Sequence, residues 1–177
     1  MGAIPESMPL GIYECPYPCK RKITPELLRW CSQTGRFVLL KDTCCDPEEM
    51  RVRQKAIDQT PFEIFNANAA TLVETLAMGL AGYSGVMANY HPELYVWLCE
   101  NWQSKPESAR ELQAFVGLCS GVEGRHYPRN AKYYQRLEGI PISQRTRRPA
   151  DHLGPADRRL VEQFRELSIL YRERITA

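Results

Sequence analysis

Lys41 closes an apolar segment whose composition is typical of a buried strand. Residues 37–41 are Phe-Val-Leu-Leu-Lys, and Asp42 and Thr43 follow directly. Desolvating an ammonium is costly, so burial favours the neutral amine, which is a nucleophile toward a carbonyl carbon. Alternatively, Lys41 has already passed the end of the strand and extends its ammonium to water. This segment taken alone favours the second interpretation.

Strand and helix signals alternate along the first part of the chain. The order βαβαβαβα predicts parallel strands joined by crossover helices. The helix expected between the second and third strands has Met50, Val52 and Ala56 on one side. The expected strands are residues 10–15, 37–41, 62–66 and 82–88.

Four side chains lie at or near the C-terminal ends of these strands. They are Tyr13, Lys41, Asn66 and Met87. Four βα units make half of a TIM (β/α)₈ barrel, a fold that typically needs about 250 residues and places its chemistry at the C-terminal ends of its strands. This shared placement raises the nucleophile interpretation of Lys41 above the solvent-exposed one.

The strand signals stop after the fourth βα unit, and the rest of the chain is predicted to be helical. Ser104 and Glu107 form a capping-box pattern, which begins a helix that ends near Cys119. We therefore expect an α/β fold, with a partial TIM barrel over residues 1–102 and an α-helical region over residues 103–177. Further helices are expected over residues 130–137 and 155–174, with a basic, proline-containing linker over residues 139–154.

Composition and charge exclude several classes of protein. Of the 177 residues, 44% are hydrophobic and 25% are charged, which is ordinary for a globular domain with its own core. A net charge of +2 gives no sign of a nucleic-acid or anionic-membrane partner. The chain has no apolar segment of transmembrane length and no signal peptide at its N-terminus. We expect a cytoplasmic protein.

The cysteines give a weaker, alternative hypothesis of a redox or metal protein. Their number is odd, their spacing matches no paired Cys-x-x-Cys set, and the three histidines do not lie at ligand spacing from them. We therefore expect free thiols, no metal site and no cofactor. The cysteines are Cys15, Cys19, Cys31, Cys44, Cys45, Cys99 and Cys119.

Three motifs, in this order and spacing, resemble the dihydrodipicolinate synthase and N-acetylneuraminate lyase family. Tyr13 and Pro16 match the Tyr-x-x-Pro motif of the family's fifth strand, and Lys41 matches the lysine of its sixth strand. Residues 82–86, Gly-Tyr-Ser-Gly-Val, match the Gly-x-x-Gly-Val pattern of the eighth strand. The family contains class I aldolases and lyases that form a Schiff base with 2-oxo acids, usually pyruvate. The resemblance extends over essentially the whole chain.

The resemblance implies roles for the four strand-end residues. Lys41 would form the imine with a 2-oxo acid, and Tyr13 would relay protons and help to position the substrate carboxylate. As an alternative, Tyr13 is an aromatic side chain that fills the barrel, which is less favoured beside Lys41. Asn66 and Met87 would line the substrate pocket. Core packing is favoured for Met87, whereas the two interpretations of Asn66 are evenly balanced.

The chain departs from the family pattern after Tyr13. Glu14 replaces the usual asparagine, and its carboxylate is either solvated or placed behind the site. Pro18 stands where dihydrodipicolinate synthases have an arginine that binds the carboxylate of the second substrate. This difference argues against that activity, although Lys20 or Arg21 could substitute for the arginine.

The resemblance begins just before the family's fifth strand. The first four strands, with the loop that binds the 2-oxo acid carboxylate, have no counterpart in this sequence. We therefore expect the C-terminal half of a Schiff-base lyase, inactive without an N-terminal half. The expected partners are a small 2-oxo acid and either further copies of the chain or a complementary half-barrel. The alternative is a non-catalytic remnant or interaction module with the same fold.

Overall fold

A computed structural model of the protein describes residues 4–147 and 152–176. Two compact units divide the chain between Gly85 and Val86. The barrel boundary expected between residues 102 and 103 follows the βα repeat rather than packing, and we retain it as a proposal. Within the described ranges, no helix combines the length and hydropathy needed to span a bilayer.

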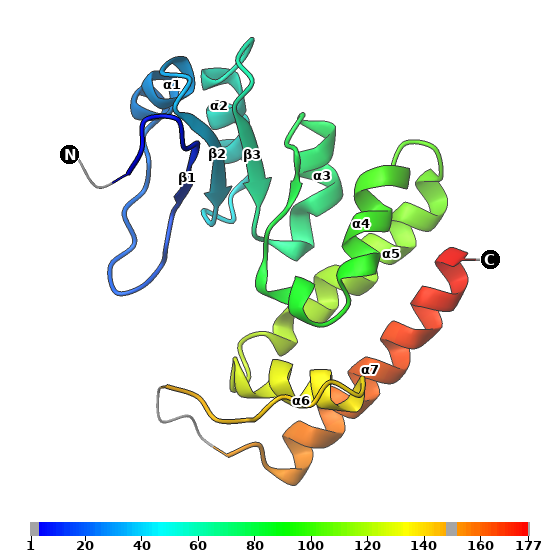
Figure 1. Ribbon diagram of the computed structural model, residues 1–177. Coiled ribbons are helices and arrows are strands. Elements are labelled where there is room, and N and C mark those ends of the chain that lie inside the picture. Colours follow the sequence, from blue (N-terminus) through cyan, green and yellow to red (C-terminus); the bar gives the residue numbers. More distant parts are fainter. Residues whose placement is uncertain (1–3, 148–151, 177) are drawn as a thin grey trace. The chain divides into compact units, whose positions relative to one another are not determined.

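The first unit contains a parallel four-stranded sheet. Each strand pairs with the next one in sequence, as neighbouring strands of a (β/α) barrel do (Figure 1). This arrangement confirms the predicted βαβαβαβ order of parallel strands. The strands are β1 (Leu10–Tyr13), β2 (Phe37–Asp42), β3 (Glu63–Asn66) and β4 (Gly82–Tyr83).

Two helices of this unit begin directly after residues whose side chains cap their first turns. Thr24 accepts a hydrogen bond from the Leu27 amide at 3.3 Å, and Asp46 accepts one from the Glu48 amide at 2.9 Å. Proline occupies the first turn of both helices, where its missing N–H has no partner to lose. The helical elements are α1 (Pro25–Gln33), α2 (Pro47–Ala56), η1 (Ala69–Thr71) and α3 (Leu72–Ala77).

The core of the first unit lies between the sheet and these helices. Leu40 and Ile64, from the two central strands, are buried in one cluster with Leu28 of α1 and Met50 of α2. Successive side chains of a strand point to opposite faces of the sheet. The residues directly before and after Leu40 and Ile64 therefore point away from α1 and α2. Lys41 is one of them.

The fourth strand is shorter than the predicted residues 82–88. After Tyr83 the chain turns and continues as the short 3₁₀ helix η2 (Val86–Asn89), which opens the second unit. The turn is tight at Gly85, where an added Cβ would overlap the Tyr83 hydroxyl and the Ala67 carbonyl oxygen. A run of small residues therefore forms a close turn here and not an extended strand.

Replacing Gly85 tests how tight this turn is. We expect Gly85→Ala to lower the free energy of unfolding by about 1–3 kcal/mol, the range for overpacking against atoms that cannot move aside. Gly121→Ala is the control, because a Cβ at Gly121 would meet no atom within 4 Å. Denaturation followed by circular dichroism compares the two variants. Equal transition midpoints for both would contradict this description of the turn.

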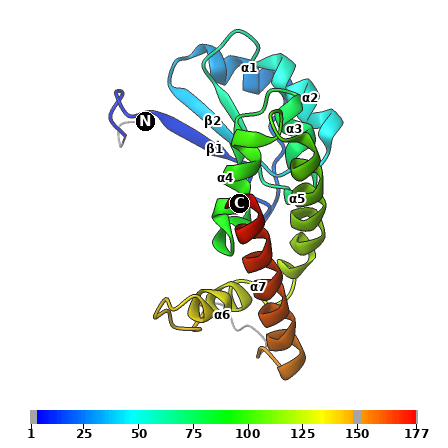
Figure 2. The ribbon, with the colours of Figure 1, turned by 90° about the vertical axis from the view of Figure 1, so that its right-hand side faces the viewer.

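The second unit is a group of packed helices. The long helix α7 (Pro155–Thr176) packs against α4 (Pro92–Asn101), α5 (Pro106–Cys119) and α6 (Arg129–Leu137). Figure 2 shows α6 crossing the first half of α7. The 3₁₀ helix η3 (Ser120–Val122) directly follows α5. The three predicted helices of the C-terminal region are thus confirmed to within a few residues.

The predicted capping box at the start of α5 is wrong. Lys105, and not Ser104, is the residue that precedes the helix, and its side chain makes no capping hydrogen bond. The Ser104 hydroxyl instead donates to the Asn101 carbonyl at 3.3 Å. Ser104 belongs to the tight connection from α4 and bonds backward, so it is not available to cap α5.

A buried histidine lies among the aromatic side chains of the second unit. His91 Nδ1 lies 3.0 Å from the Ser168 hydroxyl, and Nε2 lies 3.3 Å from the Tyr95 hydroxyl. Its ring packs against that of Phe164 with centroids 5.0 Å apart. Burial, together with the positive charge of Arg172, lowers the pKa of His91 from 6.5 to about 3. The imidazole is therefore neutral in the folded protein at neutral pH.

The lowered pKa of His91 makes stability depend on pH with a definite sign. The unfolded chain binds a proton at this residue below its ordinary pKa of 6.5, whereas the folded chain does not until about 3. The contribution of the neutral His91 side chain to stability is therefore fully present above about pH 6.5 and falls as the pH drops. We expect a loss of about 2 kcal/mol between about pH 8 and pH 5, measured by denaturation at each pH. His91→Gln should reduce this loss and His152→Gln should not; equal losses in both would contradict the assignment.

Candidate active site

Tyr13 and Lys41 lie side by side at the ends of adjacent strands. The register pairs Tyr13 of β1 with Lys41 of β2, and Lys41 with Phe65 of β3. Lys41 Nζ lies 4.7 Å from the centroid of the Tyr13 ring, a distance at which the ring face attracts a cation. Lys41 is half-buried, and Tyr13 is 50% exposed. The structure thus brings together the two residues that the sequence assigned to chemistry.

The backbone fixes this pair on one face of the sheet. The ladder between β1 and β2 continues one step beyond β1, where the Glu14 amide donates to the Lys41 carbonyl at 3.2 Å. Because Leu40 is buried against the helices, alternation places Lys41 and its partner Tyr13 on the opposite face. In a (β/α) barrel this opposite face is the interior, and Tyr13 and Lys41 lie at its C-terminal end, where active sites of such barrels form.

The residues that follow the pair point the other way and form a buried ion cluster. Arg53 of α2 reaches Glu14 through two contacts, from Nη2 to Oε1 at 2.7 Å and from Nη1 to Oε2 at 3.2 Å. The same Nη1 lies 2.5 Å from Asp42 Oδ2, and Nη2 lies 2.7 Å from Glu49 Oε1. Arg53, Glu14 and Asp42 are all buried. Glu14 is therefore not a solvated charge.

Further hydrogen bonds fix the two buried carboxylates of this cluster. Glu14 Oε1 also accepts from the Ile23 amide at 2.8 Å, and Asp42 Oδ1 accepts from the Cys44 amide at 2.7 Å. Burial by itself lowers the pKa of Arg53, but the hydrogen bonds and charges of Glu14 and Asp42 outweigh it and raise the pKa above its ordinary value. The guanidinium is therefore charged, and it forms ion pairs with both buried carboxylates.

Asn66 is placed on the same face of the sheet as Asp42, its partner in register. Its side chain is fully buried, and Nδ2 donates to the hydroxyls of Thr71 and Thr75, both at 3.0 Å. Its Oδ1 accepts from the Asn68 amide at 2.7 Å. The Asn66 side chain therefore organises the loop after β3 and is not brought toward Lys41. A substrate-binding role for this residue stays a prediction.

Met87 lies in η2 of the second unit, not at the end of a strand, and its side chain is fully buried. This burial agrees with the core packing that the sequence favoured. A substrate contact through Met87 stays a prediction.

Two basic residues from the loop after β1 were considered as substitutes for the missing arginine. Lys20 Nζ donates to the Thr43 carbonyl at 2.5 Å, which places its ammonium two residues beyond Lys41 along the chain. Arg21 is exposed. Lys20 is thus the one of the two that the structure ties to the end of β2.

The cysteines are not arranged for metal binding in residues 4–147 and 152–176, where no group of three or more His, Cys, Asp or Glu side chains is placed to hold a metal ion. No disulfide joins the seven cysteines, all of which lie in these ranges. Burial and a hydrogen bond with Asp42 raise the pKa of Cys44 to about 12, so this thiol stays protonated near Lys41. Cys44 is therefore a poor nucleophile at neutral pH.

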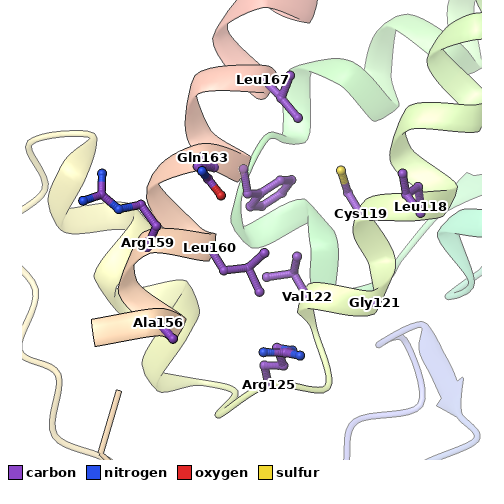
Figure 3. Close-up of a pocket in the computed structure, with 11 residues that line it drawn as sticks. Leu118, Cys119, Gly121, Val122, Arg125, Ala156, Arg159, Leu160, Gln163 and Leu167 are labelled. Atoms are coloured by element: carbon purple, nitrogen blue, oxygen red, sulfur yellow. The ribbon is translucent and has the colours of Figure 1, made fainter. Parts of the chain in front are cut away.

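An open groove of about 660 Å³ lies in the second unit, between the end of α5 and α7. Figure 3 shows the side chains of Val122 and Leu160 pointing toward each other across it. The remaining lining is mostly apolar, with Arg125 and Arg159 among it. The described lining contains the Cys119 thiol but no Asp, Glu, His, Lys or Tyr that could act as an acid or base beside it, so we assign the groove no chemistry.

A comparison with known protein families identifies the family of this chain. The model of the dihydrodipicolinate synthetase family matches residues 3–166. The chain belongs to this family. The resemblance inferred from the three motifs is thereby confirmed. Members of the dihydrodipicolinate synthetase family with solved structures share its fold.

Three of these structures illustrate the extent of the match. YagE from Escherichia coli K12, solved in complex with pyruvate, has a TM-score of 0.80 and 19% identity, over 92% of this chain and 56% of YagE. The 4-hydroxy-tetrahydrodipicolinate synthase of Methylacidiphilum fumariolicum SolV gives 0.81 and 18%, over 96% and 57%. Dihydrodipicolinate synthase from Thermotoga maritima gives 0.78 and 20%, over 92% and 56%.

These matches cover most of this chain but only part of each matched structure. The chain spans little more than half the length of the structures that it matches. Together with the parallel sheet and the helices that follow it, this confirms the predicted partial TIM barrel with a C-terminal helical region.

Proposed function

We propose that this chain carries the Schiff-base half of a lyase or aldolase that acts on pyruvate or another 2-oxo acid. The observation that supports this most directly is the pairing of Lys41 Nζ with the Tyr13 ring at 4.7 Å, at the ends of adjacent parallel strands. Membership of the dihydrodipicolinate synthetase family adds to it. An amine can form an imine with a ketone, and a phenol beside it can transfer the protons that the steps require.

The proposed reaction uses each of the two groups at a defined step. The neutral Lys41 amine attacks the ketone carbon of the 2-oxo acid, and the resulting carbinolamine loses its oxygen as water. The Tyr13 phenol donates a proton to the departing oxygen, which leaves Tyr13 as a phenolate beside the iminium. The phenolate then takes a proton from C3, which regenerates the phenol and turns the iminium into a neutral enamine. The enamine carbon adds to an aldehyde or, in the reverse direction, is released from one.

The proposed partner of this chain is a complementary half-barrel. Tyr13 and Lys41 lie on the sheet face that a closed barrel encloses, and β1 and β4 are the outer strands of the described sheet. Open strand edges and an uncovered interior face favour association. We propose that four N-terminal βα units, or further copies of this chain, cover this face and bind the substrate carboxylate. Asn66, through its backbone, and Met87 are the pocket-lining residues that we propose from this half.

Exchange of the pyruvate methyl protons in heavy water tests the proposal, because only an iminium makes them acidic enough to exchange quickly. The chain is co-expressed with the first four βα units of a family member, and the methyl signal is followed by ¹H NMR. We expect the signal to decay much faster than in buffer. Decay at the buffer rate, in a preparation where the two halves co-purify, would favour the alternative of a non-catalytic interaction module.

A further inference from the structure

The buried cluster behind the strand ends connects both candidate reactive residues to a single side chain. Glu14 directly follows Tyr13, and Asp42 directly follows Lys41. The Arg53 guanidinium bonds both carboxylates, with Nη1 shared between Glu14 Oε2 at 3.2 Å and Asp42 Oδ2 at 2.5 Å. One planar group from α2 therefore spans the ends of β1 and β2.

The geometry of the contacts makes this connection stiff. An arginine fork bound to two oxygens of one carboxylate has a fixed plane, unlike a lysine ammonium. Arg53 holds Glu14 in this way. Arg53, Glu14 and Asp42 are all buried, so none of these side chains can exchange its partners for water. Because neighbouring residues of a strand move together, fixing Glu14 and Asp42 also fixes where Tyr13 and Lys41 stand on the other face.

We propose that Arg53 is a positioning residue that sets the separation of Tyr13 and Lys41 by bonding the residues that follow them. This inference rests on the proposed function only where it concerns catalysis; the separation itself is a property of the isolated chain. A buried ion cluster is weak evidence of a contribution to stability, because apolar replacements are often as stable. Its placement behind both reactive residues is what indicates a role in geometry.

The chemical shift of a labelled Lys41 measures this geometry without any activity. Reductive methylation with ¹³C-formaldehyde adds two labelled methyl groups to each lysine and keeps its positive charge. Lys41 Nζ faces the Tyr13 ring at 4.7 Å, so its methyl signal should be shifted upfield by the ring. The signal is assigned by its absence from Lys41→Arg, and Tyr13→Leu shows where it lies without the ring.

The decisive variant combines Arg53→Met, Glu14→Gln and Asp42→Asn, which removes the cluster without leaving a buried charge uncompensated. We expect its Lys41 signal to move to the position seen in Tyr13→Leu, while circular dichroism shows retained helix and strand. Glu49→Gln is the matched control, because among the ion pairs of Arg53 it removes the outer, partly exposed one and leaves those with Glu14 and Asp42. It also removes the ion pair of Glu49 with Lys22, which lies outside the cluster's buried part. Its signal should stay at the wild-type position.

A second variant keeps the test decisive if the triple variant does not fold. Arg53→Lys retains the charge but replaces the planar fork with a compact ammonium that does not reproduce the bidentate contact with Glu14, so its Lys41 signal should move part of the way. An unshifted wild-type signal, or a wild-type signal position in the folded triple variant or in Arg53→Lys, would show that Arg53 does not position the pair.

Catalysis gives a separate readout once the complementary half is present. We expect the triple variant to lower the maximal exchange rate of pyruvate by about 10²-fold, the effect of misplacing reactive groups by about 1 Å, with little change in the half-saturating pyruvate concentration. A wild-type maximal rate in the folded variant would overturn the positioning role. If wild-type protein shows no exchange, the proposed function fails, whereas the methyl signal still decides the role of Arg53.

Discussion

Lys41→Ala is expected to reduce the exchange of pyruvate methyl protons to the rate in buffer. The variant removes the amine that forms the iminium, and no other lysine of the described residues lies within a strand. Lys22 is paired with Glu49 at 2.6 Å, and Lys55 is an exposed residue of α2. The hydrogen bond and charge of Glu49 raise the pKa of Lys22, and Lys55 lies on a helix, so neither amine can replace that of Lys41.

The matched control for this variant is Lys55→Ala, which also removes one lysine from the first unit. We expect it to exchange pyruvate protons at the wild-type rate. Wild-type exchange by Lys41→Ala would show that the nucleophile is a different residue. Lys20, whose ammonium is bonded to the Thr43 carbonyl, would then be tested next.

Tyr13→Phe should slow exchange by roughly 10²–10⁴-fold, the usual effect of losing an acid/base group. The phenol is the proton donor in our proposal, and phenylalanine keeps the ring that lies over Lys41 Nζ. Stability should change little, because Tyr13 is 50% exposed and its packing surface remains. The rate is measured by the same NMR assay, and stability by denaturation.

Tyr17→Phe serves as the control for Tyr13→Phe, since it removes one hydroxyl from a side chain that is 67% exposed. It should leave the exchange rate unchanged. An unchanged rate in Tyr13→Phe as well would return Tyr13 to the alternative role of an aromatic side chain that fills the barrel.

The pairing of Tyr13 with Lys41 could be predicted from the sequence because two simple rules determine it. Parallel strands end at the same edge of a sheet, and strand side chains alternate between faces. Thr24 and Asp46, each followed by a proline, form recognisable cap patterns at the starts of α1 and α2. These features depend on local chemistry that the sequence contains directly.

The buried Arg53 could not be predicted in the same way. Helical periodicity assigned Val52 to the buried side of α2, whereas Val52 is 52% exposed and Arg53 is fully buried. A charge is buried only when partners compensate it, and the partners here come from two different strands. The signal available in the sequence was the acidic residue that follows each of Tyr13 and Lys41, which alternation directs toward α2.

The errors at β4 and at the start of α5 have a common cause. Both lie where one element turns closely into the next, so neighbours decide the conformation more than local propensity does. Gly85 fits against Tyr83 and the backbone of Ala67, and Ser104 bonds back to α4. Neither contact is visible in a pattern of residue types.

The central claim, that Lys41 forms an imine with a 2-oxo acid, is tested most directly by trapping it. The protein with its complementary half is incubated with pyruvate and borohydride, digested, and its peptides are mapped by mass spectrometry. We predict one modified residue, Lys41, heavier by the mass of pyruvic acid less one oxygen atom. A label on another lysine, or none under conditions that label a full-length member of the family, would contradict the account.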